Sequence, residues 1–282
     1  KLVKFAGEGF DKAFLMSSGT EAMDAVYKLS KMNGRAIGKR RSGVVTFAGN
    51  WHGRTLGAQL LTTNYAQKDW IGFTDPDIHY LDFPLPWNIS EKEGAEFFDA
   101  QIASLRLRGV DPETDLAVFV LETFQGWGAL FYPLTFVRRL REFADANSIL
   151  VAFDEMQSGF SRTGKSFGFQ HYEVIPDLIA CGKGMGGGFA VSGVIGRAEI
   201  MDLPEIGNMS STHSANPIAC AAGLAVLSEI ERMDLSARSL ELGRLLHQEL
   251  DRLRQDFPEV IHSTHGKGLI GSIIFGGDKL KA

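Results

Sequence analysis

Short apolar runs alternate with helical periods along the chain, which predicts a mostly parallel sheet covered by helices. The predicted strands are continuously apolar and rich in valine and isoleucine, as strands buried on both faces are. They span residues 44–47, 116–121, 149–153, 178–181 and 191–195. The pattern therefore indicates an α/β fold.

Helices are predicted between these strands. The segment after Ser18 carries apolar residues at the spacing of one helix face, and Pro133 fits the first turn of another helix. Asn216 and Pro217 form a cap followed by a first helical residue, and the alanine-rich residues 218–227 read as a buried helix.

Residues 236–282 show a different pattern from the alternating strands and helices before them. A leucine stripe after Ser236 predicts a helix that leaves the core, and residues 260–275 read as two strands around the Gly266-Lys267-Gly268 turn. We therefore predict a large domain over 1–235 and the beginning of a small C-terminal α/β domain over 236–282.

Composition narrows the class of protein. Of the 282 residues, 44% are hydrophobic and 22% charged, as in a globular protein, and the net charge of −5 gives no electrostatic case for nucleic acid. No apolar run approaches the roughly 18 residues of a membrane span.

Two cysteines make no disulfide framework, so we expect a reducing, cytoplasmic setting. The chain opens in mid-pattern without methionine, so we expect a fragment or a processed product.

Residues 159–166 (GFSRTGKS) match the Walker A phosphate loop, which raises the alternative of a P-loop ATPase or kinase. A phosphate loop is followed at once by a long helix, whereas Gly168 and Pro176 leave room here for only a turn or two. The acidic pair Asp154-Glu155 also lies on the strand that would feed the loop, where a Walker B acid does not belong. The context opposes nucleotide binding.

Other polar residues stand where strands end and helices begin. Asp154 ends one predicted strand, with Gln157 three residues later, and Lys183 follows another strand and precedes a glycine run. Ligands of α/β sheets bind at such strand ends. A carboxylate there can hold a pyridinium nitrogen protonated, Gln157 can bond to a ring oxygen, and a lysine at a buried strand end can act as a nucleophile.

Further residues complete a site for pyridoxal 5′-phosphate (PLP). Ser18, Gly19 and Glu21 combine capping-box spacing with a helix start that can hold a phosphate. Trp51 can stack on a flat ring, and His52 beside it lies near the site. Thr212, just before a helix start, is a candidate phosphate ligand, and no metal site is predicted.

In order along the chain, these segments resemble class III aminotransferases, the group of the ornithine, acetylornithine and 4-aminobutyrate enzymes. The matching segments are SSGTEAMDAV (17–26), FAGNWHGRTLGA (47–58), ETFQGWGA (122–129), FDEMQSGFSRTGKSFGF (153–169), PDLIACGKGMGGGF (176–189) and STHSANPIACAAGLAVL (211–227). The resemblance implies the three-layer large domain of a fold-type I PLP-dependent transferase, and it explains the Walker match as a family feature.

The resemblance also implies a role for each matched position. Lys183 would bind the cofactor covalently, Asp154 would pair with the ring nitrogen and Gln157 would lie beside the ring oxygen. Gly19 and Thr20 would hold the phosphate. The other matched positions are Trp51, stacked on the ring; Glu122, close to the cofactor; and Thr212, which would reach the phosphate of a neighbouring subunit in a homodimer with shared sites.

Two departures from the family pattern limit which residue roles the resemblance implies for this chain. Trp127 stands where the family often has a glutamate that pairs with a gating arginine, and the arginine for the substrate carboxylate normally lies beyond Ala282. The implied reaction is a ping-pong transfer of an amino group from an amine to a 2-oxo acid. Decarboxylase, racemase and aminomutase reactions of the same fold stay open, as does a non-catalytic scaffold.

Overall fold

The computed structural model describes residues 1–209 and 211–276, and its centre is a seven-stranded sheet. The strand order is β1-β9-β8-β7-β4-β2-β3. The four pairs from β8 to β3 are parallel, and β9 runs antiparallel to both of its neighbours. The strands are β1 (Lys12–Met16), β2 (Gly43–Phe47), β3 (Ile78–Leu81), β4 (Leu116–Glu122), β7 (Leu150–Asp154), β8 (Leu178–Cys181) and β9 (Ser192–Gly196).

All five predicted strands are present, within a residue or two of their predicted bounds. The sheet also contains β1 and β3, which the apolar pattern did not predict. The exposed Lys12 begins β1, and β3 has polar residues inside a run of only four. Neither segment is a continuous apolar run. Each is a strand because a neighbouring strand, β9 or β2, provides its hydrogen-bond partners.

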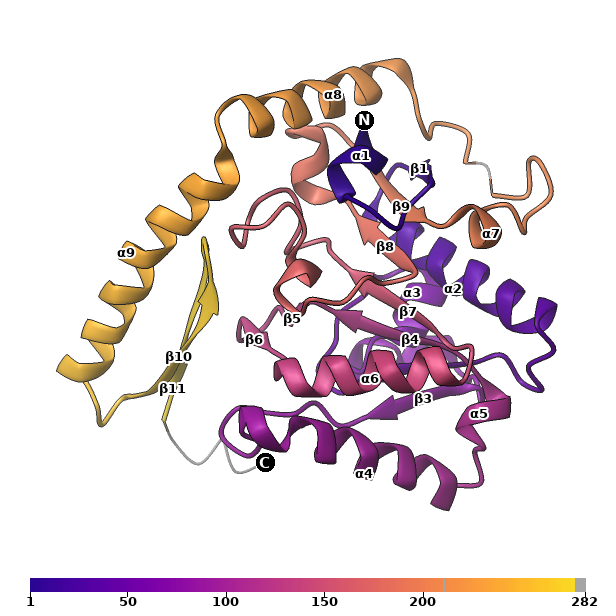
Figure 1. Cartoon of the computed structure of the whole chain (residues 1–282), viewed down its shortest axis with the longest axis horizontal. Helices are drawn as coiled ribbons and strands as arrows, with labels where there is room; N and C mark the ends of the chain where they lie inside the picture. Colours follow the sequence, from indigo (N-terminus) through magenta and orange to yellow (C-terminus); the bar gives the residue numbers. More distant parts are fainter. Residues whose placement is uncertain (210, 277–282) are drawn as a thin grey trace.

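Helices cover both faces of this sheet, which makes the three layers of the predicted fold (Figure 1). Side chains alternate between faces along each strand. On β7, Val151 and Phe153 join a cluster with α4 and α6, whereas Leu150 and Ala152 join a cluster with α2 and α3. The bounds are α2 (Gly19–Ala36), α3 (Leu56–Leu61), α4 (Gly94–Leu107) and α6 (Leu134–Ala146).

The remaining elements are short or peripheral. Pro133 is the residue before α6 rather than part of its first turn. A small hairpin and three short helices lie around the sheet, namely β5 (Phe124–Gln125), β6 (Leu130–Phe131), α1 (Leu2–Ala6), α5 (Pro112–Asp115) and α7 (Ala198–Met201). Within the described residues, no helix combines the length and apolar character needed to cross a membrane.

Two long helices and a hairpin close the described chain. Helix α8 (Pro217–Arg232) begins as predicted, because the Asn216 side chain accepts the Ala219 N–H at 2.9 Å. Its predicted burial is wrong, since Ile218 and Leu224 are 66% and 51% exposed. Helix α9 (Leu235–Asp256) packs against the predicted hairpin of β10 (Ile261–Lys267) and β11 (Ile270–Phe275), as Figure 1 shows. The domain boundary near residue 235 stays a prediction.

Candidate active site

The predicted site lies at the carboxyl ends of the parallel strands. Glu122 is the last residue of β4 and Asp154 the last of β7, and the strand register places them side by side. Because side chains alternate, both belong to the face that α2 covers. Lys183 follows β8 after one intervening glycine. Three residues far apart in the sequence therefore converge on one edge of the sheet.

A cavity of about 380 Å³ at this edge is lined by nine of the ten predicted site residues. Its volume is in the range of pockets that hold small cofactors. The predicted residues in its wall are Ser18, Gly19, Thr20, Trp51, His52, Glu122, Asp154, Gln157 and Lys183, and Gly53, Arg54 and Met156 complete the lining. Arg54 was missed, although it follows Trp51 and His52 within one loop.

Thr212 is the predicted residue that the structure leaves outside this cavity. It lies in an exposed turn before α8. Its neighbour Ser211 reaches the Glu21 carboxylate at 3.5 Å, near the start of α2. A role for Thr212 in the cavity of a second subunit stays a prediction.

Asp154 is held by protein donors on both of its oxygens. Oδ2 lies 2.9 Å from Nδ1 of the buried His52, and Oδ1 accepts the Met156 N–H at 3.0 Å. A carboxylate cannot donate, so His52 carries its proton on Nδ1. These contacts hold the Asp154 carboxyl in place in the wall of the cavity.

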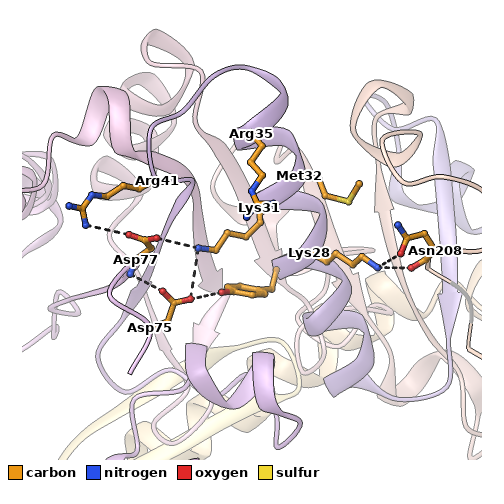
Figure 2. A pocket seen from close by; sticks show the side chains of 9 residues that line it. Lys28, Lys31, Met32, Arg35, Arg41, Asp75, Asp77 and Asn208 are labelled. Atoms are coloured by element: carbon orange, nitrogen blue, oxygen red, sulfur yellow. Dashed lines mark hydrogen bonds and ion pairs between the residues drawn. The ribbon is translucent and has the colours of Figure 1, made fainter. Parts of the chain in front are cut away.

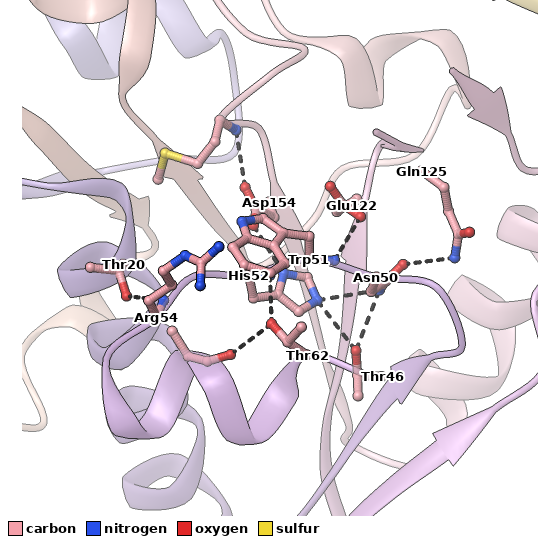
Figure 3. Close-up of polar contacts among 12 residues, drawn as sticks. Thr20, Thr46, Asn50, Trp51, His52, Arg54, Thr62, Glu122, Gln125 and Asp154 are labelled. Carbon is pink, nitrogen blue, oxygen red and sulfur yellow. Dashed lines mark hydrogen bonds and ion pairs between the residues drawn. The ribbon is translucent and has the colours of Figure 1, made fainter. Parts of the chain in front are cut away.

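The hydrogen bonds continue away from Asp154 (Figure 3). Asn50 Nδ2 lies 3.2 Å from His52 Nε2, and Asn50 Oδ1 accepts a Gln125 amide N–H at 3.1 Å. Gln125 Oε1 in turn accepts the indole N–H of Trp127 at 2.7 Å. Every donor in this chain points toward Asp154, so each bond polarises the next.

Glu122 is buried, and its carboxylate accepts the backbone N–H of Trp51 at 3.0 Å. Burial, followed by the adjacent charge of Asp154, raises the pKa of Glu122 well above its usual value, while the Trp51 N–H and the Lys183 charge oppose the rise. The raised pKa favours the neutral form of Glu122 beside Asp154.

The start of α2 forms another wall of the cavity. The Glu21 carboxylate accepts the backbone N–H groups of Ser17 and Ser18, at 3.0 and 2.7 Å. The Thr20 hydroxyl accepts two N–H groups of the 54–55 segment, so it holds that loop. The first N–H groups of the helix lack acceptors within the helix and form a suitable cradle for a phosphate.

Lys183 differs from its predicted environment. It is exposed at the edge of the cavity, whereas the sequence suggested a buried strand end. Its backbone has a φ of 44°, in the left-handed region that residues with a Cβ rarely adopt. Such conformations cost of order 1–3 kcal/mol and cluster at functional sites.

Trp51 and Arg54, from the loop after β2, also line the cavity. Trp51 is half-buried, and the guanidinium of Arg54 lies 4.8 Å from the centre of its ring. An indole in the cavity wall can offer a flat surface to a planar ligand. Gln157 lines both this cavity and a second cavity of about 610 Å³.

The Walker-like segment is organised by a buried carboxylate. Residues 156–163 form turns and residues 164–167 form bends. A 3₁₀ helix of four residues, Gly168–His171, follows them in place of a long helix. Glu155, on the opposite face of the sheet from Asp154, accepts the N–H groups of Gly168 and Phe169 at 2.7 and 2.6 Å. The long helix that follows a phosphate loop is thus absent from this described segment, which opposes the nucleotide alternative.

A larger cavity, of about 670 Å³, opens along α2 away from the predicted residues (Figure 2). Three of the four cationic residues in its lining, Lys28, Lys31 and Arg41, lie near local acceptors. Lys31 lies 3.9 Å from Asp75, Arg41 lies 3.5 Å from Asp77, and Lys28 bonds to Asn208. The cavity therefore has the character of a surface ion-pair network.

Comparison with known proteins agrees with this architecture. The family model "Aminotransferase class-III" matches residues 1–281, and the chain belongs to that family. It is 34% identical over 253 residues to a probable 4-aminobutyrate aminotransferase of Bacillus subtilis, covering 88% of this chain and 57% of that protein. A leucine/methionine racemase of Thermococcus litoralis is 34% identical over 260 residues, 90% of this chain and 57% of that protein.

Among solved structures, a PLP-bound amine transaminase from an uncultivated Pseudomonas species superposes with a TM-score of 0.87 at 27% identity. The match covers 98% of this chain and 65% of that one. The predicted family and fold are thus confirmed. The chain spans less than two thirds of the length of these relatives.

The cavity fits the cofactor of this family. A Cβ added at Gly19 would lie 2.8 Å from the Met156 sulfur, so the helix start presents bare backbone there. A pyridinium can pair with the buried carboxyl of Asp154. A phosphate can bind at the helix start, and a flat ring can pack on the half-buried indole of Trp51. Lys183 supplies an accessible amine at the same cavity.

Proposed function

We propose that this chain is the cofactor-binding part of a PLP-dependent aminotransferase that transfers an amino group from an amine to a 2-oxo acid. Asp154 and Lys183 carry the proposal, because an anion and an amine from neighbouring strands line one cavity of cofactor size. When bound, PLP supplies an electron-accepting ring that stabilises charge on the substrate carbon.

The chain's own residues have separable roles in this proposal. Asp154, held by His52, binds the protonated ring nitrogen. Lys183 Nζ takes the proton from the substrate α-carbon as general base and later returns it as general acid. Gln157 binds the ring oxygen, Trp51 covers one face of the ring, and the start of α2 with Gly19 and Thr20 binds the phosphate.

The test uses the PLP-loaded, full-length protein and its visible absorption. Lys183→Ala is expected to abolish the band and its response to amines, whereas Lys165→Ala, an exposed lysine in the Walker-like segment, leaves both intact. An unchanged band in Lys183→Ala refutes the assignment. Binding of Mg-ATP that is lost in Lys165→Ala would restore the nucleotide alternative.

Racemisation is the second candidate, because racemases are among the similar proteins. The two reactions differ in their need for an acceptor. Incubation of one amino-acid enantiomer without an oxo acid distinguishes them. Formation of the opposite enantiomer supports a racemase, and product that depends on an added oxo acid supports the aminotransferase.

We further propose a homodimer in which Thr212 reaches the phosphate of the other subunit, and a reducing, cytoplasmic setting for the free Cys181 and Cys220. Exposed apolar residues on α8, such as Ile218 and Leu224, support an association surface. A protein that sedimentation shows to be monomeric while it retains full activity would contradict the shared site.

A further inference from the structure

Two buried amides and a buried imidazole form a chain that ends on Asp154 (Figure 3). The chain runs from Gln125 through Asn50 to His52, and all three side chains are buried. Buried polar atoms take their hydrogen-bond partners from the protein, so a donor has to meet an acceptor at every step. The neighbours of each amide therefore decide which way its oxygen and nitrogen point.

Gln125 is held by two groups that each have only one possible hydrogen-bond role. The indole N–H of Trp127, which can only donate, lies 2.7 Å from Oε1. The carbonyl of Ala48, which can only accept, receives a hydrogen bond from Nε2. A Cβ added at Gly49 would clash with Gln125 Oε1, so bare backbone makes room for this amide. Exchanging its oxygen and nitrogen would place donor against donor and acceptor against acceptor.

The orientation of Gln125 fixes Asn50, and Asn50 in turn fixes His52. Gln125 Nε2 donates to Asn50 Oδ1 at 3.1 Å, so the NH₂ group of Asn50 is the one that lies 3.2 Å from His52 Nε2. Thr46 Oγ1 lies 3.3 Å from both of these nitrogens and can donate or accept, so it fits this arrangement. Because a donor faces it, Nε2 of His52 carries a lone pair, and the ring proton is on Nδ1.

His52 in this form is neutral, which affects the charge that Asp154 can offer. Nδ1 donates to Asp154 Oδ2 at 2.9 Å without adding a charge of its own. An imidazolium would also donate to Asp154, but its positive charge would offset the negative charge of an ionised Asp154 before a cofactor binds. It would also need an acceptor at Nε2, where the NH₂ group of Asn50 lies.

We propose that Gln125 is a positioning residue of the cofactor site. Through Asn50 it holds His52 in the neutral form that is protonated on Nδ1, and it thereby keeps the charge of Asp154 for the ring nitrogen of PLP. The state of His52 is a property of the protein alone, whereas its effect on the cofactor rests on the proposed aminotransferase function. In metal sites, partners that fix which histidine nitrogen is protonated are worth about ten- to hundredfold in affinity or activity.

Nitrogen NMR of the full-length, cofactor-free protein with ¹⁵N-labelled histidine reads the state of His52, and His52→Gln assigns its signals. At neutral pH we expect one N–H nitrogen and one lone-pair nitrogen. Asn50→Asp replaces the NH₂ group by an acceptor and should add a proton to Nε2. Gln125→Met keeps the side-chain length but releases Asn50, so the Nε2 signal should move part of the way in the same direction. The control is Gln101→Glu on α4, whose oxygen can still accept the Asp82 N–H, and it should keep the parent signals.

A second readout follows the binding of PLP through the visible band. The half-saturating PLP concentration should rise about tenfold or more in Asn50→Asp, rise by a smaller factor in Gln125→Met and keep the parent value in Gln101→Glu. A proton on Nε2 in the parent protein overturns the inference without any variant. His52 signals that Gln125→Met leaves unchanged, or an unchanged PLP affinity in Asn50→Asp, also overturn it. A parent protein that gives no visible band with PLP instead refutes the aminotransferase function and leaves the state of His52 standing.

Discussion

Replacing Glu155 by glutamine tests whether a buried carboxylate holds the Walker-like segment. One oxygen accepts the Thr123 hydroxyl and the Phe169 N–H, and the other accepts the Ser158 hydroxyl and the Gly168 N–H. Glutamine presents an NH₂ group in place of one oxygen. A hydroxyl can turn to accept from it, but a backbone N–H cannot.

The expected loss of stability follows from these contacts. An unsatisfied buried N–H costs about 1–3 kcal/mol, and the remaining bonds lose the strength that a charged acceptor gave them. Burial raises the pKa of Glu155, so a neutral amide regains part of the cost of burying the charge. We therefore expect Glu155→Gln to lower the free energy of unfolding by about 2 kcal/mol.

Urea denaturation followed by circular dichroism measures this change. The matched control is Glu142→Gln on α6. The Glu142 side chain is 70% exposed, and its carboxylate lies 3.7 Å from the guanidinium of Arg139. Its effect should stay within about 0.5 kcal/mol. Equal midpoints for the two variants would refute the reasoning, because the segment would then not depend on the charge of Glu155.

Three further predictions concern stability. The pKa of Glu122 is raised in the folded protein, so its contribution to the free energy of unfolding is full below the unfolded pKa of about 4.5. That contribution is lost as pH rises toward the folded pKa. The free energy of unfolding of the cofactor-free wild type should therefore fall, relative to that of Glu122→Gln, by up to about 1.4 kcal/mol per pH unit. Parallel urea midpoints of the two proteins from pH 5 to 7.5 would contradict this. Lys183→Gly should be about 1 kcal/mol more stable than Lys183→Ala, since glycine adopts a φ of 44° without strain, and equal midpoints would exclude strain there. Asn216→Ala should cost about 1 kcal/mol through loss of the α8 cap, and an unchanged thermal midpoint would argue against it.

Part of the site was predictable because it is local. A strand end, a helix cap and a glycine-flanked lysine are each visible within a few residues, and parallel strands place their carboxyl ends at one edge. The hydrogen-bond chain from Trp127 to Asp154 was not predictable, since it joins residues 50, 52, 125, 127 and 154 through side-chain positions that only packing fixes.

The sequence by itself determined the apolar strands, the helix starts and the α/β class, because burial on two faces and unsatisfied helix ends leave local residue patterns. Only the tertiary structure decided the strand order, the inclusion of β1 and β3, the exposure of Lys183 and of one face of α8, and the use of the Walker-like segment around Glu155. Those outcomes depend on which distant segments supply partners for a given hydrogen bond or apolar face, and no local pattern contains that information.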